Sequence, residues 1–152
     1  MRLALKSLVA SGGCIALAFS IASAVSSAAI APDKYTVKVP GGLGFSEFKG
    51  YEGWQAVSVS HHEGAFAVIL ANPVMIEAYL SGIPGNGKPF PDGSKMAKIH
   101  WNPIKSETAP TPTTVPGALQ NVDFMEKDSK RFADSSGWGW SAFEYDAASN
   151  SF

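Results

Sequence analysis

Several side chains in the last third of the sequence are of types that could act on a small ligand. Glu144 would share one face of a predicted strand with Trp138 and Trp140, because alternate strand residues point to the same side. The two indoles could wall an apolar cofactor pocket, and a carboxyl group within such a pocket could act as an acid or base. The other reading is an ordinary core for the indoles and a surface position for Glu144.

The three histidines do not predict a dedicated metal site. His61 and His62 are adjacent, so on a strand their side chains point to opposite faces and cannot hold one ion together. His100 is distant in sequence, and a site of two histidines and a carboxylate would need Glu63 or Asp92 to converge on it. Nothing in the spacing requires that convergence, so His100 is expected to be an ordinary strand residue or to face the edge of a cofactor.

Two glycines alternate with indoles in the run Gly137-Trp138-Gly139-Trp140. Glycine within a strand usually marks a bulge or the close approach of another group to the backbone. A flat cofactor is one such group, and a second copy of the chain is another. No glycine-rich phosphate loop and no serine-nucleophile motif occurs in the sequence.

These residues must be positioned by a sheet. Alternating or continuous apolar patterns predict strands over residues 35–39, 54–60, 66–70, 95–101, 119–127 and 138–145. Short connections between them favour antiparallel pairing. The expected fold class is therefore α+β, a mainly antiparallel β-sheet with one or two flanking helices.

The clearest helix follows Asn72, whose side chain is suited to an N-cap, and has Pro73 at its first position. Gly82 stands where a helix C-terminus favours a left-handed residue. The side expected to face the sheet carries Val74, Ile76, Tyr79 and Leu80.

The N-terminal residues predict export. Arg2 and Lys6 precede a stretch of apolar and small residues that runs from Leu8 to Val25, which is typical of a secretory signal. We expect residues 1–29 to be a signal peptide and 33–152 to be the mature domain, periplasmic or secreted. An uncleaved anchor helix is the alternative.

The mature domain is mildly acidic and has no thiol. Without the signal, ten basic side chains remain against 13 acidic ones, a net charge of −3, which argues against nucleic acid and anionic lipid as partners. The only cysteine, Cys14, lies within the signal, so neither a disulfide nor a cysteine-based zinc site is expected.

Five short blocks, taken in order, resemble the cytochrome P460 family of exported c-type haem proteins, over about residues 54–152. The blocks are Val68-Ile69-Leu70-Ala71-Asn72, Gly87-Lys88-Pro89-Phe90-Pro91-Asp92-Gly93, Ala97-Lys98-Ile99-His100-Trp101, Phe124-Met125-Glu126-Lys127-Asp128 and Gly137-Trp138-Gly139-Trp140.

The resemblance implies a haem protein, usually a homodimer, that oxidises hydroxylamine or a related small nitrogen species and passes electrons to a cytochrome. Two alternatives remain open: a non-catalytic module that binds haem and nitric oxide, of the cytochrome c-prime-beta kind, and a haem-free remnant.

The family's oxidising members cross-link a lysine to the porphyrin, and the resemblance makes Lys98 the first candidate for that role. Lys88 and Lys95 are weaker candidates. Trp138 and Trp140 become the candidate pocket wall, and Glu144 becomes the candidate distal acid or base. Lys98 could equally point to solvent, opposite its apolar neighbours.

Relatives hold haem c through a Cys-x-x-Cys-His motif near the C-terminus, and this sequence has none after Asp146. We therefore expect a C-terminally truncated chain, whether fragment, early stop or frameshift, with no haem bound covalently. Such a chain should expose apolar surface around Trp138, Trp140 and Phe143.

Overall fold

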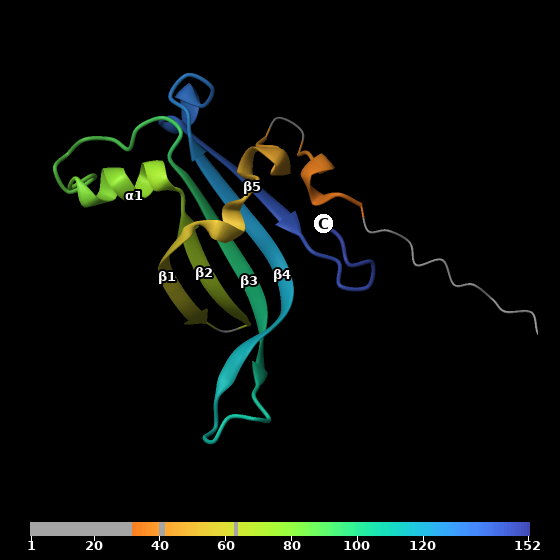
Figure 1. The fold of residues 1–152 in the computed structure, drawn as a ribbon. Helices are drawn as coiled ribbons and strands as arrows, with labels where there is room; N and C mark the ends of the chain where they lie inside the picture. Colours follow the sequence, from red (N-terminus) through yellow and green to blue (C-terminus); the bar gives the residue numbers. More distant parts are fainter. Residues whose placement is uncertain (1–31, 40–41, 63) are drawn as a thin grey trace, which may run out of the picture.

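The computed structural model describes residues 32–39, 42–62 and 64–152. The predicted signal peptide over residues 1–29, with Cys14, lies outside the described residues. The five strands form a single antiparallel sheet in sequence order: β1 (Gln55–His62), β2 (Ala65–Ala71), β3 (Lys95–Lys105), β4 (Thr114–Lys127) and β5 (Trp138–Glu144) (Figure 1).

This sheet, flanked by one α-helix and short 3-10 helices, confirms the predicted α+β class. Every strand pairs with the strand next to it in sequence. The longest connection, residues 72–94 between β2 and β3, contains the α-helix. The β3–β4 hairpin extends well beyond the rest of the sheet (Figure 1). None of the helices in the described part of the chain has the length and apolar character needed to cross a membrane.

Helix α1 (Pro73–Leu80) begins where the sequence predicts. The Asn72 side chain accepts a hydrogen bond from the Met75 amide at 3.1 Å, and Gly82 adopts a left-handed φ of 95°. The predicted sheet-facing side is only partly right. Met75, Ile76 and Tyr79 border a hollow against the sheet, although Tyr79 is itself exposed, and Val74 and Leu80 are exposed outside the hollow.

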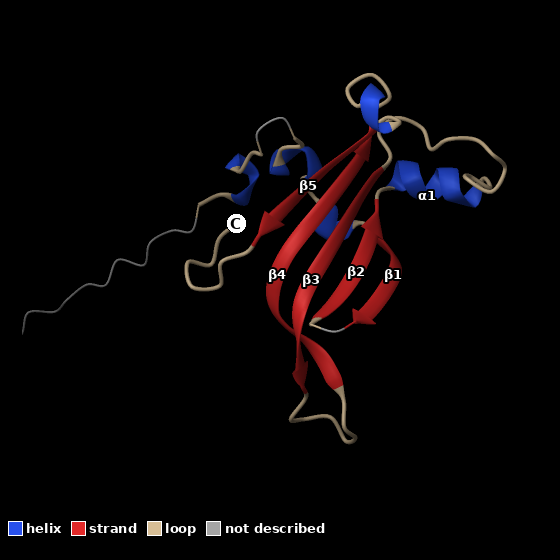
Figure 2. Cartoon of the chain, turned by 180° about the vertical axis from the view of Figure 1, so that it is seen from behind, coloured by secondary structure: helices blue, strands red, loops and turns tan. Residues whose placement is uncertain are grey.

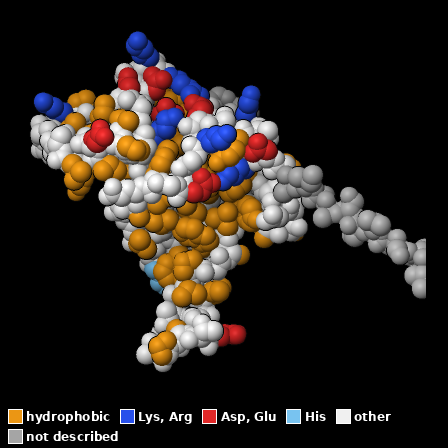
Figure 3. All heavy atoms as spheres, in the orientation of Figure 1, with side chains coloured by type: hydrophobic (Ala, Val, Ile, Leu, Met, Phe, Trp, Pro, Cys, Tyr) orange, Lys and Arg blue, Asp and Glu red, His pale blue; other side chains and the backbone are white. Residues whose placement is uncertain are grey.

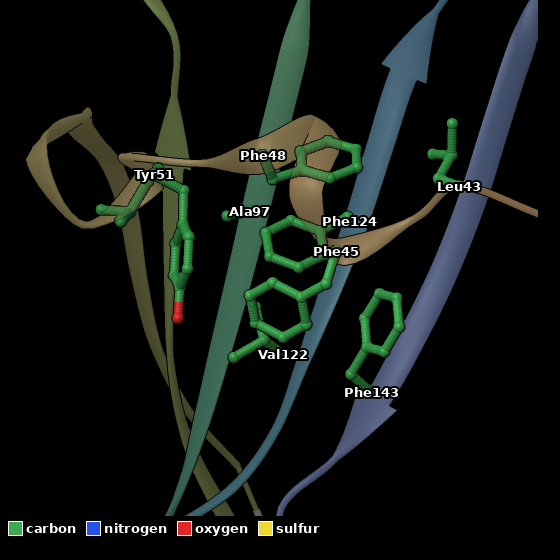
Figure 4. Close-up of a cluster of buried hydrophobic side chains, with 9 residues drawn as sticks. Leu43, Phe45, Phe48, Tyr51, Ala97, Val122, Phe124 and Phe143 are labelled. Atoms are coloured by element: carbon green, nitrogen blue, oxygen red, sulfur yellow. The ribbon is translucent and has the colours of Figure 1, made fainter. Parts of the chain in front are cut away.

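The N-terminal segment covers one face of the sheet, which we call the covered face. The short helices η1 (Lys34–Thr36), η2 (Phe45–Phe48) and η3 (Tyr51–Gly53) belong to this segment. The aromatic core forms beneath it: the Phe48 and Phe124 rings stack at 4.1 Å, and Phe45 is fully buried beside them (Figure 4).

The predicted strand over residues 35–39 is wrong. Asp33 accepts a hydrogen bond from the Tyr35 amide at 3.0 Å and winds the chain into η1. Val37 and Val39 then pack against the core cluster without joining the sheet. Their alternation reflects packing onto a face and not membership of a strand.

The opposite side of the sheet, which we call the open face, carries no comparable cover among the described residues. Seen from behind, strands β2 to β4 are unobstructed and α1 lies to one side (Figure 2). A register shift between Ala56 and Ser58 also breaks the predicted alternation of β1. Val57 borders the hollow under α1, whereas Val59 pairs with Val68, which packs against the core.

The covered face is itself divided. Charged side chains gather over its upper part, and an apolar band lies below the N-terminal segment (Figure 3). Phe143 lies in the core and is 4% exposed, with its ring 4.8 Å from that of Phe45. The predicted exposure of Phe143 is therefore wrong, whereas Trp140 is 56% exposed on the open face.

Candidate functional site

The strand register brings the chemically interesting residues into three rows across the open face. Met96 pairs with Met125, which pairs with Trp140 on β5. In the next row Lys98 pairs with Asp123, and in the third His100 pairs with Asn121, which pairs with Glu144. Because residues two apart on a strand share a face, all these side chains point to the same side of the sheet.

The first two rows border a shallow hollow of about 190 Å³. Lys98 and Asp123 lie on one side of it and Trp140 on another, so the structure brings two of the predicted site residues together. Lys98 is half-buried here, and its neighbours are mainly apolar. The side chains of Ile69, Met96 and Met125 also line it.

A second apolar hollow of about 300 Å³ lies between α1 and the sheet. Met96 borders both hollows, so the two adjoin, and we call them together the groove of the open face. Trp138 does not line the hollow beside Lys98. Its ring stands 6.2 Å from that of Phe90, which lines the hollow under α1, and the Lys127 ammonium lies 5.6 Å from the Trp138 ring.

A polar strip borders the groove on its other side. The His100 Nε2 and the Asp123 Oδ2 are 3.0 Å apart, and the Asn121 amide donates to Asp123 Oδ1 at 2.7 Å. Asp123 therefore stands between this strip and the hollow. Asp123 is the carboxylate that lines the hollow. The sequence analysis did not single it out, because its position beside Lys98 depends on the β3–β4 register, which the sequence does not show.

Glu144 lies on the predicted face but one row further from the hollow. It is exposed, it pairs with Asn121, and it does not line either part of the groove. The structure therefore places Glu144 with Trp140 on one strand face, as predicted, but does not bring its carboxylate to Lys98.

The weaker lysine candidates lie elsewhere. The Lys95 ammonium donates to the Glu47 carbonyl at 2.8 Å and lies 3.2 Å from a Glu126 carboxylate oxygen, on the covered side. Lys88 is exposed in the loop after α1. His61 stacks on Phe66 at 4.3 Å, and the described residues contain no group of three histidine, cysteine or acidic side chains that could share a metal ion.

The close neighbour of Gly139 is neither a cofactor nor a second chain. A side chain at this position would begin 2.3 Å from the ring of Phe132, which packs over the strand from the loop before β5. Gly137 precedes the strand and has a φ of 80°, which favours glycine. Both predicted alternatives for Gly139 are therefore wrong: the approaching group is a ring of the same chain.

A model of a known protein family matches this chain. The cytochrome P460 model matches residues 48–151, about two thirds of the chain. The chain belongs to the cytochrome P460 family. No curated protein matches it in sequence.

Complete members of the cytochrome P460 family contain haem, and the groove on the open face is suited in part to that group. Its floor is one face of the sheet and is lined by Ile69, Met96, Met125 and Trp140, with one lysine and one carboxylate at its edge. Residues 32–152 contain no cysteine, so they supply no thiol for the thioether bonds of haem c. The described residues therefore fit the wall of a haem pocket but not its covalent anchor.

Proposed function

We propose that the open face of this cytochrome P460 domain holds the haem of the complete family form, with Lys98 at the porphyrin edge, and that the domain oxidises hydroxylamine or a related small nitrogen species. The observation that carries the proposal is that Lys98 and Trp140 line the same apolar hollow, on the uncovered side of the sheet.

The residues around the hollow have separable roles in this proposal. Met96, Met125 and Trp140 would pack against the porphyrin and exclude water from it. Haem, when bound, would supply the redox chemistry, and a cytochrome would accept the electrons taken from the substrate. Asp123 accepts a proton released from the nitrogen or oxygen of the substrate, because it is the carboxylate beside the hollow. Glu144, exposed one row away, would exchange protons with solvent.

The second candidate function is binding of nitric oxide without turnover. The lining of the hollow is mostly apolar, with Ile69, Met96 and Met125 facing one lysine and one carboxylate. Such a surface suits an uncharged diatomic molecule. The two functions differ in whether Lys98 becomes bonded to the porphyrin and whether hydroxylamine is consumed.

Titration with haemin tests the proposal. Haemin should quench tryptophan fluorescence and develop a Soret band in the wild-type protein, and Lys98→Met and Trp140→Ser should each weaken binding by about tenfold. Lys88→Met is the matched control, because Lys88 is exposed outside the groove. Equal affinity of Lys98→Met and wild type would contradict the assigned face.

Incubation of the haem-loaded protein with hydroxylamine and an artificial electron acceptor separates the two functions. Turnover together with a porphyrin adduct on the Lys98 peptide in mass spectrometry supports oxidation. Ferrous nitrosyl formation without an adduct supports the binding module instead.

We also propose that the chain is exported and works as a homodimer outside the cytoplasm. The proposal rests on the signal-like pattern of residues 1–29 and on the family. N-terminal sequencing of exported protein should begin at Ala29 or Ile30, and light scattering should give twice the mass of one mature chain. A retained Met1 would contradict the cleavage.

A further inference from the structure

The carboxylate of Asp123 is held at both oxygens by side chains of the polar strip. His100 lies on β3, and its Nε2 is 3.0 Å from Asp123 Oδ2. Asn121 lies two residues before Asp123 on β4 and donates to Oδ1 at 2.7 Å. Two donors on different oxygens fix the plane of a carboxylate as well as its position.

Burial differs between the two members of the His100–Asp123 pair. The His100 side chain is 12% exposed and the Asp123 side chain 42% exposed. The imidazole therefore has little freedom to turn away from the carboxylate, whereas the carboxylate still reaches the groove. His100 is therefore held in place, and the Asp123 carboxylate that it contacts remains accessible from the groove.

The local backbone favours the same reading. The β3–β4 register shifts directly after His100, where Trp101 pairs with Leu119, so β4 has an extra residue, Gln120. Gln120 donates to Asn102 Oδ1 at 2.6 Å and to the Gly64 carbonyl at 2.8 Å, which ties the irregular stretch across β3 to the β1–β2 turn. Bulges of this kind redirect side chains and strengthen local twist, and here one lies beside the pair.

We propose that His100 is a positioning residue: with Asn121 it holds the Asp123 carboxylate in one orientation at the border of the hollow, so that its free lone pairs face a ligand beside Lys98. The contact itself is independent of the proposed function, and its consequence for proton transfer rests on that function. A neutral or charged His100 can serve equally, because either form can carry a proton on Nε2.

Nuclear magnetic resonance of the haem-free protein tests the contact. In the wild type, long-range 1H–15N spectra should show a protonated His100 Nε2. The 13C carboxyl signal of Asp123 should shift in His100→Leu, and His100→Gln should restore most of the wild-type position because its amide can donate to the same oxygen. His61→Leu is the matched control, since this histidine stacks on Phe66 away from the pair.

An unchanged Asp123 carboxyl signal in folded His100→Leu would overturn the proposal. Should His100→Leu fail to fold, comparison of His100→Gln with Asp123→Asn decides the matter. If His100 and Asp123 are hydrogen-bonded, the imidazole nitrogen signals of His100 must shift in Asp123→Asn relative to the wild type. Unchanged signals would show that the hydrogen bond does not form.

Turnover of the haem-loaded protein tests the consequence. Loss of partners that orient catalytic or metal-bound groups typically costs 10- to 100-fold in activity. In His100→Leu we expect kcat for hydroxylamine to fall about tenfold, with KM within about twofold of the wild-type value. The His100→Gln variant should recover most of the lost kcat. An unaltered kcat in His100→Leu would contradict the catalytic consequence. Absence of turnover in the wild type would instead refute the proposed oxidation, while the spectra would still decide the contact.

Discussion

The ring of Phe132 occupies the space beside Gly139 that any side chain would need. The nearest ring atom would lie 2.3 Å from an added Cβ, and two further ring atoms would lie within 2.7 Å. Glycine here has no unusual φ to provide, because Gly139 is a regular strand residue. Its role is therefore to let the ring seal the covered side of β5, opposite the exposed Trp140.

Gly139→Ala should destabilise the protein by about 1–3 kcal/mol, because overpacking forces the ring or the strand to move. Urea unfolding followed by circular dichroism measures the change. Gly53→Ala is the matched control, since no atom lies within 4 Å of its added Cβ and its φ is not left-handed, so it should be nearly neutral.

Phe132→Leu should itself lower stability, because the ring packs against the core cluster. In the Phe132→Leu background, Gly139→Ala should cost less than in the wild type, because the smaller side chain can yield. An equal cost of Gly139→Ala in both backgrounds would show that the close approach of the ring is not the cause.

At the scale of elements, Asn72 joins α1 to the start of β3. Its Oδ1 accepts from the Met75 amide at 3.1 Å and from the Lys95 amide at 3.0 Å, and its Nδ2 donates to the Gly93 carbonyl at 2.8 Å. The side chain is 9% exposed, so each of these bonds is shielded from water. One residue thus caps the helix and sets where the loop of residues 83–94 returns to the sheet.

Asn72→Ala should lower the free energy of unfolding by about 2–3 kcal/mol, since a helix cap contributes about 1 kcal/mol and the bonds to the loop and β3 add comparable amounts. Asn72→Asp keeps both accepted bonds but turns a carboxylate oxygen toward the Gly93 carbonyl, so it should cost about 1–2 kcal/mol. Chemical denaturation compares the two variants. An equal loss in both would show that the acceptor role does not matter.

At the scale of the whole molecule, the N-terminal segment is fastened to the sheet by charged side chains. Arg131, in the loop before β5, donates to the Glu47 carboxylate, and its second nitrogen reaches the Gly42 carbonyl at 3.1 Å. Burial raises the pKa of Glu47, but hydrogen bonds from Arg131 and from the Gly44 amide outweigh it and hold that pKa below its ordinary value of 4.5. This fastening holds the N-terminal segment on its part of the covered face.

Acid should therefore loosen the segment. A carboxylate whose pKa is lowered on folding stabilises the fold above its ordinary pKa, and that contribution is lost as pH falls through the lowered value. The free energy of unfolding should drop more steeply between about pH 5 and pH 3 in the wild type than in Glu47→Gln.

At neutral pH, Glu47→Gln should cost about 1 kcal/mol or less, because the pair is partly exposed. Glu107→Gln, in the exposed β3–β4 loop, is the control and should retain the wild-type slope. If the free energy of unfolding fell equally steeply with pH in wild type and in Glu47→Gln, the Glu47 carboxylate would not be the group that stabilises the segment. Thermal melts across the pH range give the comparison.

Much of the site could be predicted from local sequence. Strand alternation placed Trp138, Trp140 and Glu144 on one face. The family resemblance made Lys98 the first candidate for the porphyrin cross-link, and that role stays a prediction. The register confirms the common face, but it also shows that Asp123 and not Glu144 lines the hollow with Lys98. A strand's own period says which residues share a face; it does not say which residue of the next strand lies opposite.

By itself the sequence determined the elements whose signals are local: the N-cap at Asn72, the β1–β2 hairpin and the alternation of β3 and β5, together with the order of motifs that marks the family. Only the tertiary structure decided that residues 35–39 pack on the sheet without joining it, that Phe132 and not a cofactor lies against Gly139, and that His100 supports Asp123. Each of those outcomes depends on contacts between segments far apart in the chain. Packing and strand register arise only when the sheet assembles. They decide which distant residues come into contact, and the local sequence pattern is compatible with more than one such arrangement.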